Sequence, residues 1–288
     1  MANIGTDAVA LLRYLSQHPV GARRPVRALA NFISWQIRSR LNPGSHVEPW
    51  VAGSRLVVQR GMVGATGNLY FGLHEFSDMG LLLHLLKPGD LFLDVGANVG
   101  TYTVLAGAVR EARCLSFEPD PETATKLRAN LAANAIADRV TIHETALGAS
   151  DGEIAFTVGL DTINRVASAE EPHRIVPMAR LDSLIGDIEP VLMKVDVEGH
   201  EDAMFAGAQQ VLQKPSLLAI MTESAGPETL ASFARFGFER RFYNPWTRSL
   251  SADPNPWHDN NMLFVRNIDA IMDRVAATPA IKLFGLRL

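Results

Sequence analysis

A carboxylate and two glycines stand where a predicted buried strand gives way to a helix, and their spacing suits a polar ligand. An apolar run over residues 91–93 ends at Asp94, a turn with Gly96 and Gly100 follows, and a helical pattern begins at once. Glycine allows a sharp turn and a close approach to the backbone. Free N–H groups at the helix start attract an anion. The expected ligand-binding turn comprises Asp94, Gly96, Ala97, Asn98, Gly100 and Thr101.

A second carboxylate follows at the distance expected for a nucleotide-like cofactor. Residues 114–117 form a short predicted strand, and Glu118 and Pro119 end it, 18 residues after Gly100 (118 − 100). A carboxylate at the tip of the second strand can accept hydrogen bonds from both hydroxyls of a ribose. The alternative is that the turn and the acid are two ordinary helix starts in an α/β domain.

The charge of Asp94 indicates which cofactor is expected. The related turn G-x-G-x-x-G is suited to a pyrophosphate, whereas the spacing here is D-x-G-x-N-x-G, and its carboxylate would repel that group. S-adenosylmethionine (SAM) instead carries an ammonium and a sulfonium group, and its own carboxylate can accept from the helix N–H groups. We therefore expect SAM. Glu75, in the preceding helix, is either a partner for the ammonium or a helix-start acid.

A second group of charged residues lies near the end of a later predicted strand, over residues 191–197. Lys194, Asp196 and Glu198 alternate, so they are expected on one side of that strand. Open α/β sheets bind ligands at the carboxyl ends of their strands, so Asp196 should lie beside the cofactor turn. Lys194 and Asp196 are candidate catalytic residues, with Asp196 also a candidate cofactor contact. They could instead form a structural ion pair.

Removal of a proton from an acceptor hydroxyl calls for a base. His200, at the start of the next helix, is the candidate, because a neutral imidazole titrates near physiological pH. His258 is an alternative base. Asp196, Glu198 and Glu223 could together hold a hard cation, but acids on one strand are a weak signal for a metal. No metal is assigned.

The order of predicted elements indicates the fold class. Strands alternate with helices from residue 74 onward, which is typical of a doubly wound, mostly parallel sheet of Rossmann-like type. The last two strands follow each other without a helix between them and predict an antiparallel edge strand. Four segments are expected: a basic helical arm (1–45), a short-strand extension (46–73) with a turn at Gly67 and Asn68, the main domain (74–266), and a C-terminal helix and tail (267–288). Residues 159–180 are expected to be irregular and to cover the site.

Composition excludes several classes of protein. The chain has 288 residues, of which 47% are hydrophobic and 20% charged, so a folded core is expected. A net charge of −4 leaves no basic footprint for nucleic acid. A single cysteine, Cys114, excludes an internal disulfide and favours a reducing compartment, so we expect a cytoplasmic protein.

The first 45 residues differ in charge from the rest of the chain. Six arginines face one acid there, which gives +5 (6 − 1). A basic helix that carries aromatic residues can lie on an anionic membrane surface, here the inner face of the membrane. The alternative is an arm packed on its own domain or on a second subunit, as in a homo-oligomer.

The two motifs together resemble those of the FkbM family of methyltransferases. The family pattern is D-V-G-A-N-x-G, an acid–proline pair, A-L-G, and K-[IV]-D-V-E-G-x-E. Here it is matched by residues 94–100, Glu118 with Pro119, residues 146–148 and residues 194–201. The resemblance covers about residues 70 to 265. It implies a SAM-dependent O-methyltransferase with sugar or polyketide hydroxyls as common acceptors, and it adds Ala146 to the expected cofactor contacts.

The function expected from the sequence is therefore SAM-dependent methylation of a hydroxyl on a sugar, glycan, glycolipid or polyketide-like acceptor. Two alternatives remain. A nucleotide-dependent oxidoreductase on a Rossmann sheet is disfavoured by Asp94 and by the missing third glycine. A SAM-binding module without catalytic activity would keep Asp94, Gly96, Gly100 and Glu118 but lack a working acceptor site.

Overall fold

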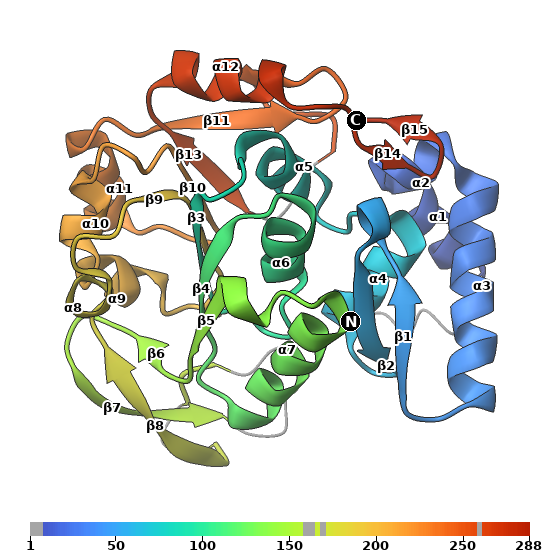
Figure 1. Cartoon of the computed structure of the whole chain (residues 1–288), viewed down its shortest axis with the longest axis horizontal. Helices are drawn as coiled ribbons and strands as arrows, with labels where there is room; N and C mark the ends of the chain where they lie inside the picture. The colour runs from blue at the N-terminus through green and yellow to red at the C-terminus, as the bar shows by residue number, and fades with distance from the viewer. Residues whose placement is uncertain (1–7, 158–164, 168–170, 258–260) are drawn as a thin grey trace.

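A computed structural model describes residues 8–157, 165–167, 171–257 and 261–288. Its centre is an eight-stranded sheet in the order β12-β11-β13-β10-β9-β3-β4-β5 (Figure 1). The strands are β3 (Leu91–Val95), β4 (Arg113–Phe117), β5 (Val140–His143), β9 (Pro190–Val195), β10 (Ala219–Thr222), β11 (Glu239–Asn244), β12 (Ser249–Ser251) and β13 (Met262–Val265).

Strand pairing confirms the predicted fold class. β5, β4, β3, β9 and β10 run parallel, and Asp94 pairs with Ser116 on one side and Lys194 on the other. β13 is antiparallel to β10 and β11, and β12 is antiparallel to β11. The sheet is therefore doubly wound and mostly parallel, with antiparallel pairing at one edge.

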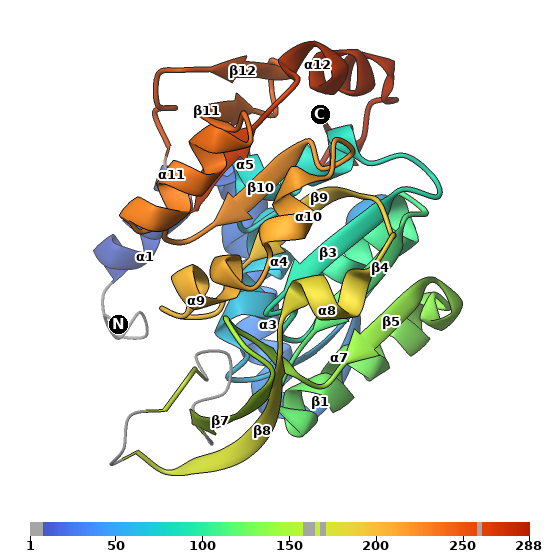
Figure 2. The same ribbon diagram turned by 90° about the vertical axis from the view of Figure 1, so that its left-hand side faces the viewer.

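Helices cover both faces of the sheet. Successive side chains of a strand point to opposite sides, and here both sides carry apolar residues that need to be buried. Phe92 and Leu192 face one core, against α5 and α6, whereas Leu93 and Met193 face the other, against α8 to α11. Figures 1 and 2 show these helices on opposite sides of the sheet. The helices are α4 (Val63–Phe71), α5 (Phe76–Leu85), α6 (Thr101–Val104), α7 (Pro121–Asn134), α8 (Leu181–Ile185), α9 (Glu201–Ala206), α10 (Gln209–Gln213), α11 (Pro227–Arg235) and α12 (Ile268–Ala277), with short helical turns at Val51–Gly53, Leu105–Val109 and Ala137–Arg139.

The N-terminal arm is helical, as expected, and lies along one side of the molecule (Figure 1). It comprises α1 (Ala8–Gln17), α2 (Pro19–Arg23) and α3 (Pro25–Leu41). α2 and α3 each begin at a proline, whose fixed φ suits the first helical position and whose missing N–H costs nothing there. α3 packs against α4. Among the described residues, none of the helices has the length and apolar character that crossing a membrane requires.

The extension after the arm differs from the prediction. It begins with the expected strands, β1 (Ser45–Pro49) and β2 (Arg55–Gln59), which pair antiparallel. The turn predicted at Gly67 and Asn68 is wrong, because both residues lie inside helix α4. A Cβ at Gly67 would lie 2.5 Å from the His74 ring, so glycine is needed here for close packing of the helix.

The segment predicted to be irregular contains a strand. β8 (His173–Ala179) pairs antiparallel with β7 (Gly152–Thr157) and parallel with β6 (Ala146–Leu147), which makes a three-stranded sheet in the order β6-β8-β7. Residues 158–164 and 168–170 of the same segment lie outside the described residues. At the C-terminus, the expected tail forms a hairpin of β14 (Lys282–Leu283) and β15 (Leu286–Arg287).

Candidate functional site

A cavity opens at the carboxyl ends of β3, β4 and β9. Its position is the one at which open α/β sheets bind their ligands. Both apolar and polar side chains line it. The lining residues are Val95, Gly96, Asn98, Phe117, Glu118, Pro119, Thr123, Thr145, Ala146, Leu147, Phe156, Val166, Asp196, Val197, Glu198 and His200.

The glycine turn brings two strand ends into direct contact. Gly96 has φ +77°, and a Cβ there would lie 1.9 Å from the carbonyl oxygen of Asp196. The Asp196 N–H in turn donates to Val95 O at 2.9 Å. Gly100 has φ +88°, and a Cβ there would lie 2.2 Å from Leu127 Cδ1 on α7. The Asp196 backbone therefore excludes a side chain at Gly96, and the positive φ favours glycine at both positions.

Glu118 lies at the tip of β4 and is held beside the turn. Its Oε2 accepts the Asn98 N–H at 2.9 Å, and its Oε1 accepts the Asp120 N–H at 3.0 Å. The side chain lines the cavity although the residue is only 6% exposed. Burial raises the pKa of Glu118 to about 7, against the effect of the two N–H donors. The carboxylate is therefore fixed in orientation before any ligand arrives.

Asp94 lies behind the turn. It is buried, and its Oδ2 accepts a hydrogen bond from Thr103 Oγ1 at 2.6 Å. Burial raises its pKa to about 6, while the nearby charge of Lys194 acts in the opposite direction. Besides Glu75, four of the predicted cofactor contacts are not among the described residues that line the cavity: Asp94, Ala97, Gly100 and Thr101. Direct contact of these four with a cofactor stays a prediction.

Lys194 and Asp196 form the ion pair that the sequence left open, with Nζ and Oδ2 separated by 2.6 Å. Lys194 is 3% exposed, and its ammonium also lies 4.7 Å from the centre of the Tyr102 ring. Burial by itself would lower the pKa of Lys194, but the charges of Asp196, Glu75 and Asp94 outweigh it and raise that pKa. Asp196 lies in the cavity wall, so the pair is both structural and part of the candidate site.

Removal of this ammonium should destabilise the fold. Lys194→Met would leave the buried carboxylate of Asp94 and the carboxylate of Asp196 without their common cation. We expect the free energy of unfolding to fall by about 3–5 kcal/mol. The matched control is Lys214→Met, because Lys214 pairs with the exposed Glu189 at 3.7 Å and should cost under about 1 kcal/mol. Urea unfolding measures both, and equal losses would contradict this role of Lys194.

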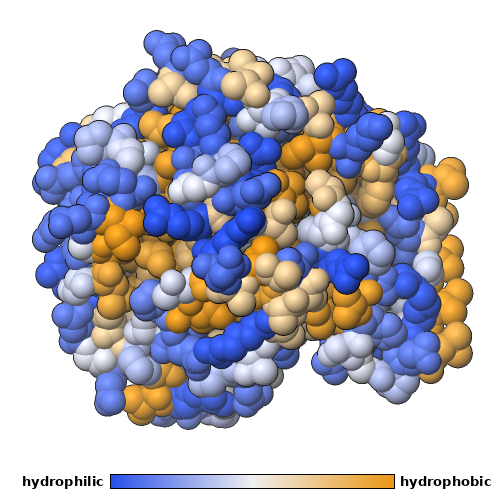
Figure 3. Space-filling model, in the orientation of Figure 1, coloured by the Kyte–Doolittle hydropathy of each residue, from blue (hydrophilic) through white to orange (hydrophobic). Residues whose placement is uncertain are grey.

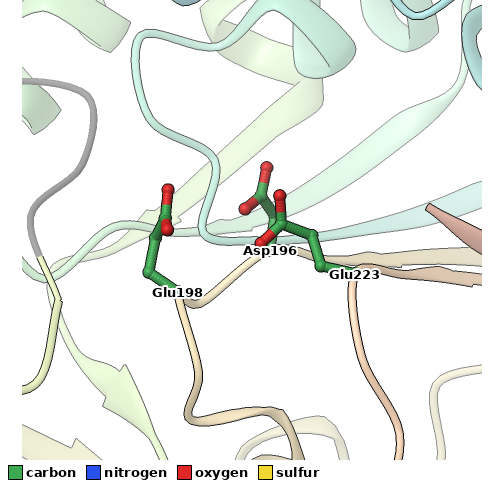
Figure 4. A group of neighbouring side chains, drawn as sticks. All are labelled: Asp196, Glu198 and Glu223. Carbon is green, nitrogen blue, oxygen red and sulfur yellow. The ribbon is translucent and has the colours of Figure 1, made fainter. Parts of the chain in front are cut away.

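Three carboxylates lie close together just beyond the ends of β9 and β10 (Figure 4). Oxygens of Asp196, Glu198 and Glu223 lie within 4.8 Å of one another. Burial raises the pKa of Glu198 and also that of Glu223, the latter to about 7, and the neighbouring carboxylates add to both shifts. The sequence spacing suggested that Glu198 continues the strand. It does not, because β9 ends at Val195 and Glu198 has φ +51° in the turn beyond it.

Two further acids, the last residue of this motif and the one that follows it, have structural partners that the sequence did not reveal. Glu201 is 1% exposed; its Oε1 accepts the Gly199 N–H at 3.2 Å, and its Oε2 accepts from Ser224 Oγ at 2.6 Å. It fixes the loop that carries Glu198. Asp202 accepts the Gly226 N–H at 2.8 Å at the start of α11. Both contacts join segments that are distant in sequence, so no local pattern could indicate them.

His200 also lines the cavity, on the side of the A-L-G segment. Its Nε2 is buried without a hydrogen-bond partner among the described residues, and a Cβ at Gly148 would lie 3.3 Å from that atom. Burial lowers the pKa of His200, against the effect of the Glu201 charge, and therefore favours the neutral imidazole. The alternative base, His258, lies outside the described residues.

The last predicted contact, Glu75, lies on the other side of Lys194. Its charge acts on that ammonium, and its Oε1 accepts from Asn261 Nδ2 at 3.2 Å. Glu75 is not among the described residues that line the cavity. Two tryptophans cover the same region: Trp246 packs on Phe76, and Trp257 Nε1 donates to Ser77 Oγ at 3.2 Å.

Comparison with known proteins gives a consistent picture. A family profile described as the methyltransferase FkbM domain matches residues 94–241. The hexuronic acid methyltransferase AglP of Haloferax volcanii is 28% identical over 146 residues, which cover 49% of this chain and 59% of that protein. The match therefore spans less than two thirds of the length of this relative.

Solved structures with a related arrangement include two methyltransferases. The methyltransferase FkbM of Methylobacillus flagellatus KT is 18% identical, with 70% of this chain and 54% of that chain covered and a TM-score of 0.43. A SAM-dependent methyltransferase of Thiobacillus denitrificans, solved with S-adenosyl-L-homocysteine, is 12% identical, with 58% and 64% covered and a TM-score of 0.36.

Proposed function

The chain belongs to the FkbM family of methyltransferases, and on this premise we propose that it transfers a methyl group from SAM to a hydroxyl of a sugar or glycan. The observation that carries the proposal is the carboxylate of Glu118. It is buried, held by two backbone N–H groups, and directed into a cavity at the strand ends. A fixed acceptor at this point suits the two hydroxyls of a ribose.

The residues around Glu118 fit the remaining parts of SAM. Phe117, Leu147 and Phe156 supply an apolar wall for an adenine ring. The carboxylates of the lining, Glu118, Asp196 and Glu198, together supply negative charge for the ammonium and sulfonium groups, so that none of them is the sole partner. SAM supplies an activated methyl group when bound. The negative charges of Asp196, Glu198 and Glu223 would repel a pyrophosphate. This disfavours the alternative that the chain is a nucleotide-dependent oxidoreductase.

Binding of the cofactor is the first test of this proposal. Isothermal titration calorimetry with SAM should give a saturable one-to-one binding curve, whereas NAD, whose pyrophosphate meets the acids, should give none. Binding of NAD in preference to SAM would overturn the cofactor assignment.

The chain must also orient the acceptor and remove its proton. We propose that Asp196, held in place by Lys194, accepts a hydrogen bond from a neighbouring hydroxyl of the acceptor and so orients the reacting hydroxyl toward His200. His200 then takes the proton, since burial favours its neutral form. A sugar acceptor is supported by the relative from Haloferax volcanii, whose name gives a hexuronic acid as its substrate.

His200→Ala should lower the rate of methyl transfer while SAM affinity stays within a few-fold. Loss of a general base costs about 10²–10⁴-fold in rate, and the imidazole does not hold the turn that carries Glu118. Single-turnover transfer measured from about pH 5.5 to about pH 9 would report the titration of this group. A pH–rate profile that the substitution leaves unchanged would remove His200 as the base and direct attention to Glu223.

SAM affinity should rise with pH because of Glu118. Its pKa is raised to about 7, so the carboxyl is protonated below that pH, and the ribose hydroxyls bind best to the ionised form. The affinity should therefore fall by up to about tenfold for each pH unit below about 7 and level off above it. Calorimetry across this range should show the slope in the wild type and a flat profile in Glu118→Gln. Parallel profiles for the two proteins would show that another group titrates.

A further inference from the structure

Helix α3 is apolar on two opposite faces. Its inner face contributes the buried residues Ala28 and Trp35 to the core. Its outer face carries four large apolar side chains at spacings of seven, four and four residues, which place them on one side of a helix. They are Val26 (80% exposed), Ile33 (47%), Ile37 (53%) and Leu41 (74%). We call these four residues the α3 stripe.

The α3 stripe lies on the outside of the molecule. α3 forms the right-hand edge in Figure 1, and apolar side chains gather along that edge in Figure 3. A contiguous apolar patch on a protein surface commonly marks an interaction site. We therefore expect the outer face of α3 to contact a binding partner.

Charge identifies the chemistry of that partner. Arg27 and Arg40 are exposed. The helical repeat places one of them on each side of the α3 stripe. The first 45 residues carry +5 (six arginines and one aspartate), so the remainder of the chain carries −9 (−4 − 5). The positive charge is concentrated in the arm that holds the apolar face, whereas the domain with the cavity is negative.

We propose that the outer face of α3 docks on an anionic membrane surface. The α3 stripe would enter the boundary between headgroups and acyl chains, and Arg27 and Arg40 would contact the lipid phosphates. The negative main domain would be repelled from the same surface, which fixes the orientation of the docked molecule. A second copy fits this face less well, because a two-fold pair of α3 helices would bring the arginines of both copies to one seam.

Vesicle sedimentation with the full chain tests this proposal. The protein should pellet with vesicles of phosphatidylcholine and phosphatidylglycerol, much less with phosphatidylcholine alone, and less as salt is raised. Ile33→Ser with Ile37→Ser should reduce partitioning by about tenfold or more through lost apolar burial. Arg27→Glu with Arg40→Glu should reduce it by about tenfold or more through lost charge attraction.

The matched control is Ile188→Ser with Leu230→Ser, which removes two exposed apolar side chains of the main domain (38% and 41% exposed). It should partition like the wild type, and thermal melts of all variants should agree, since every changed side chain is exposed. Equal partitioning of the α3 variants and the control would overturn the proposal. So would a dimer in solution that Ile33→Ser with Ile37→Ser converts to a monomer, without vesicle binding by the wild type.

Discussion

Asp196→Asn should lower the rate of methyl transfer by about 10²–10⁴-fold while SAM affinity changes by only a few-fold. The substitution keeps the shape of the side chain but removes the charge that pairs with Lys194 Nζ at 2.6 Å and faces the cavity. An amide oxygen is a weaker acceptor than a carboxylate oxygen for a hydrogen bond from a hydroxyl group. The measurement is single-turnover transfer with saturating SAM, accompanied by calorimetry.

The control for this experiment is Asp187→Asn, the same chemical change at an exposed position in the turn before β9. It lies at the amino end of that strand, whereas the cavity lies at the carboxyl end, so transfer should be unaffected. A normal rate in Asp196→Asn would show that the carboxylate serves only the ion pair. Loss of SAM binding together with loss of transfer would assign it to the cofactor site instead.

Glu118→Ala should weaken SAM binding by about 2–3 kcal/mol, the loss expected for charge-assisted hydrogen bonds to two hydroxyls. This corresponds to about 30-fold to about 150-fold in Kd. Calorimetry at about pH 8, above the raised pKa of Glu118, gives the full effect because the wild-type carboxyl is then ionised.

Glu118 also holds the N–H groups of Asn98 and Asp120, so the fold of the variant needs its own check. A thermal melt provides it, and Glu118→Gln, which keeps one acceptor oxygen, should bind SAM with intermediate affinity. Glu122→Ala is the matched control, since its side chain is 79% exposed at the start of α7. Wild-type affinity in a folded Glu118→Ala would remove this residue from the cofactor site.

Much of the core could be predicted from sequence because its signals are local. A buried strand, a glycine turn and a helix start lie within a dozen residues, and the parallel sheet then brings the ends of β3, β4 and β9 together. The approach of Glu118 to the turn and of Asp196 to Gly96 follows from that topology. The helical arm was also predictable, because Pro19 and Pro25 divide its helical pattern and Pro43 with Gly44 ends it.

The remaining features depend on contacts between distant segments. Over a shorter distance, Gly67 looks like a turn residue but lies inside α4, where it packs against the His74 ring. The strand β8 forms because β6 and β7 are available on its two sides. Glu201 supports the site loop through Ser224, which follows β10. β8 and its partner strands, and likewise Glu201 and Ser224, are more than 15 residues apart, so a local pattern cannot reveal these pairs.

The central claim is that this chain methylates a sugar hydroxyl with the methyl group of SAM. The most direct measurement is mass spectrometry of uronic acid glycosides, neutral glycosides and glycolipids incubated with the wild type and SAM that carries a deuterated methyl group. We expect the label in an ether of a sugar hydroxyl, with S-adenosylhomocysteine formed in equal amount, and no label with Asp196→Asn. Label in a carboxylate ester, or S-adenosylhomocysteine formed without any labelled acceptor, would contradict the claim.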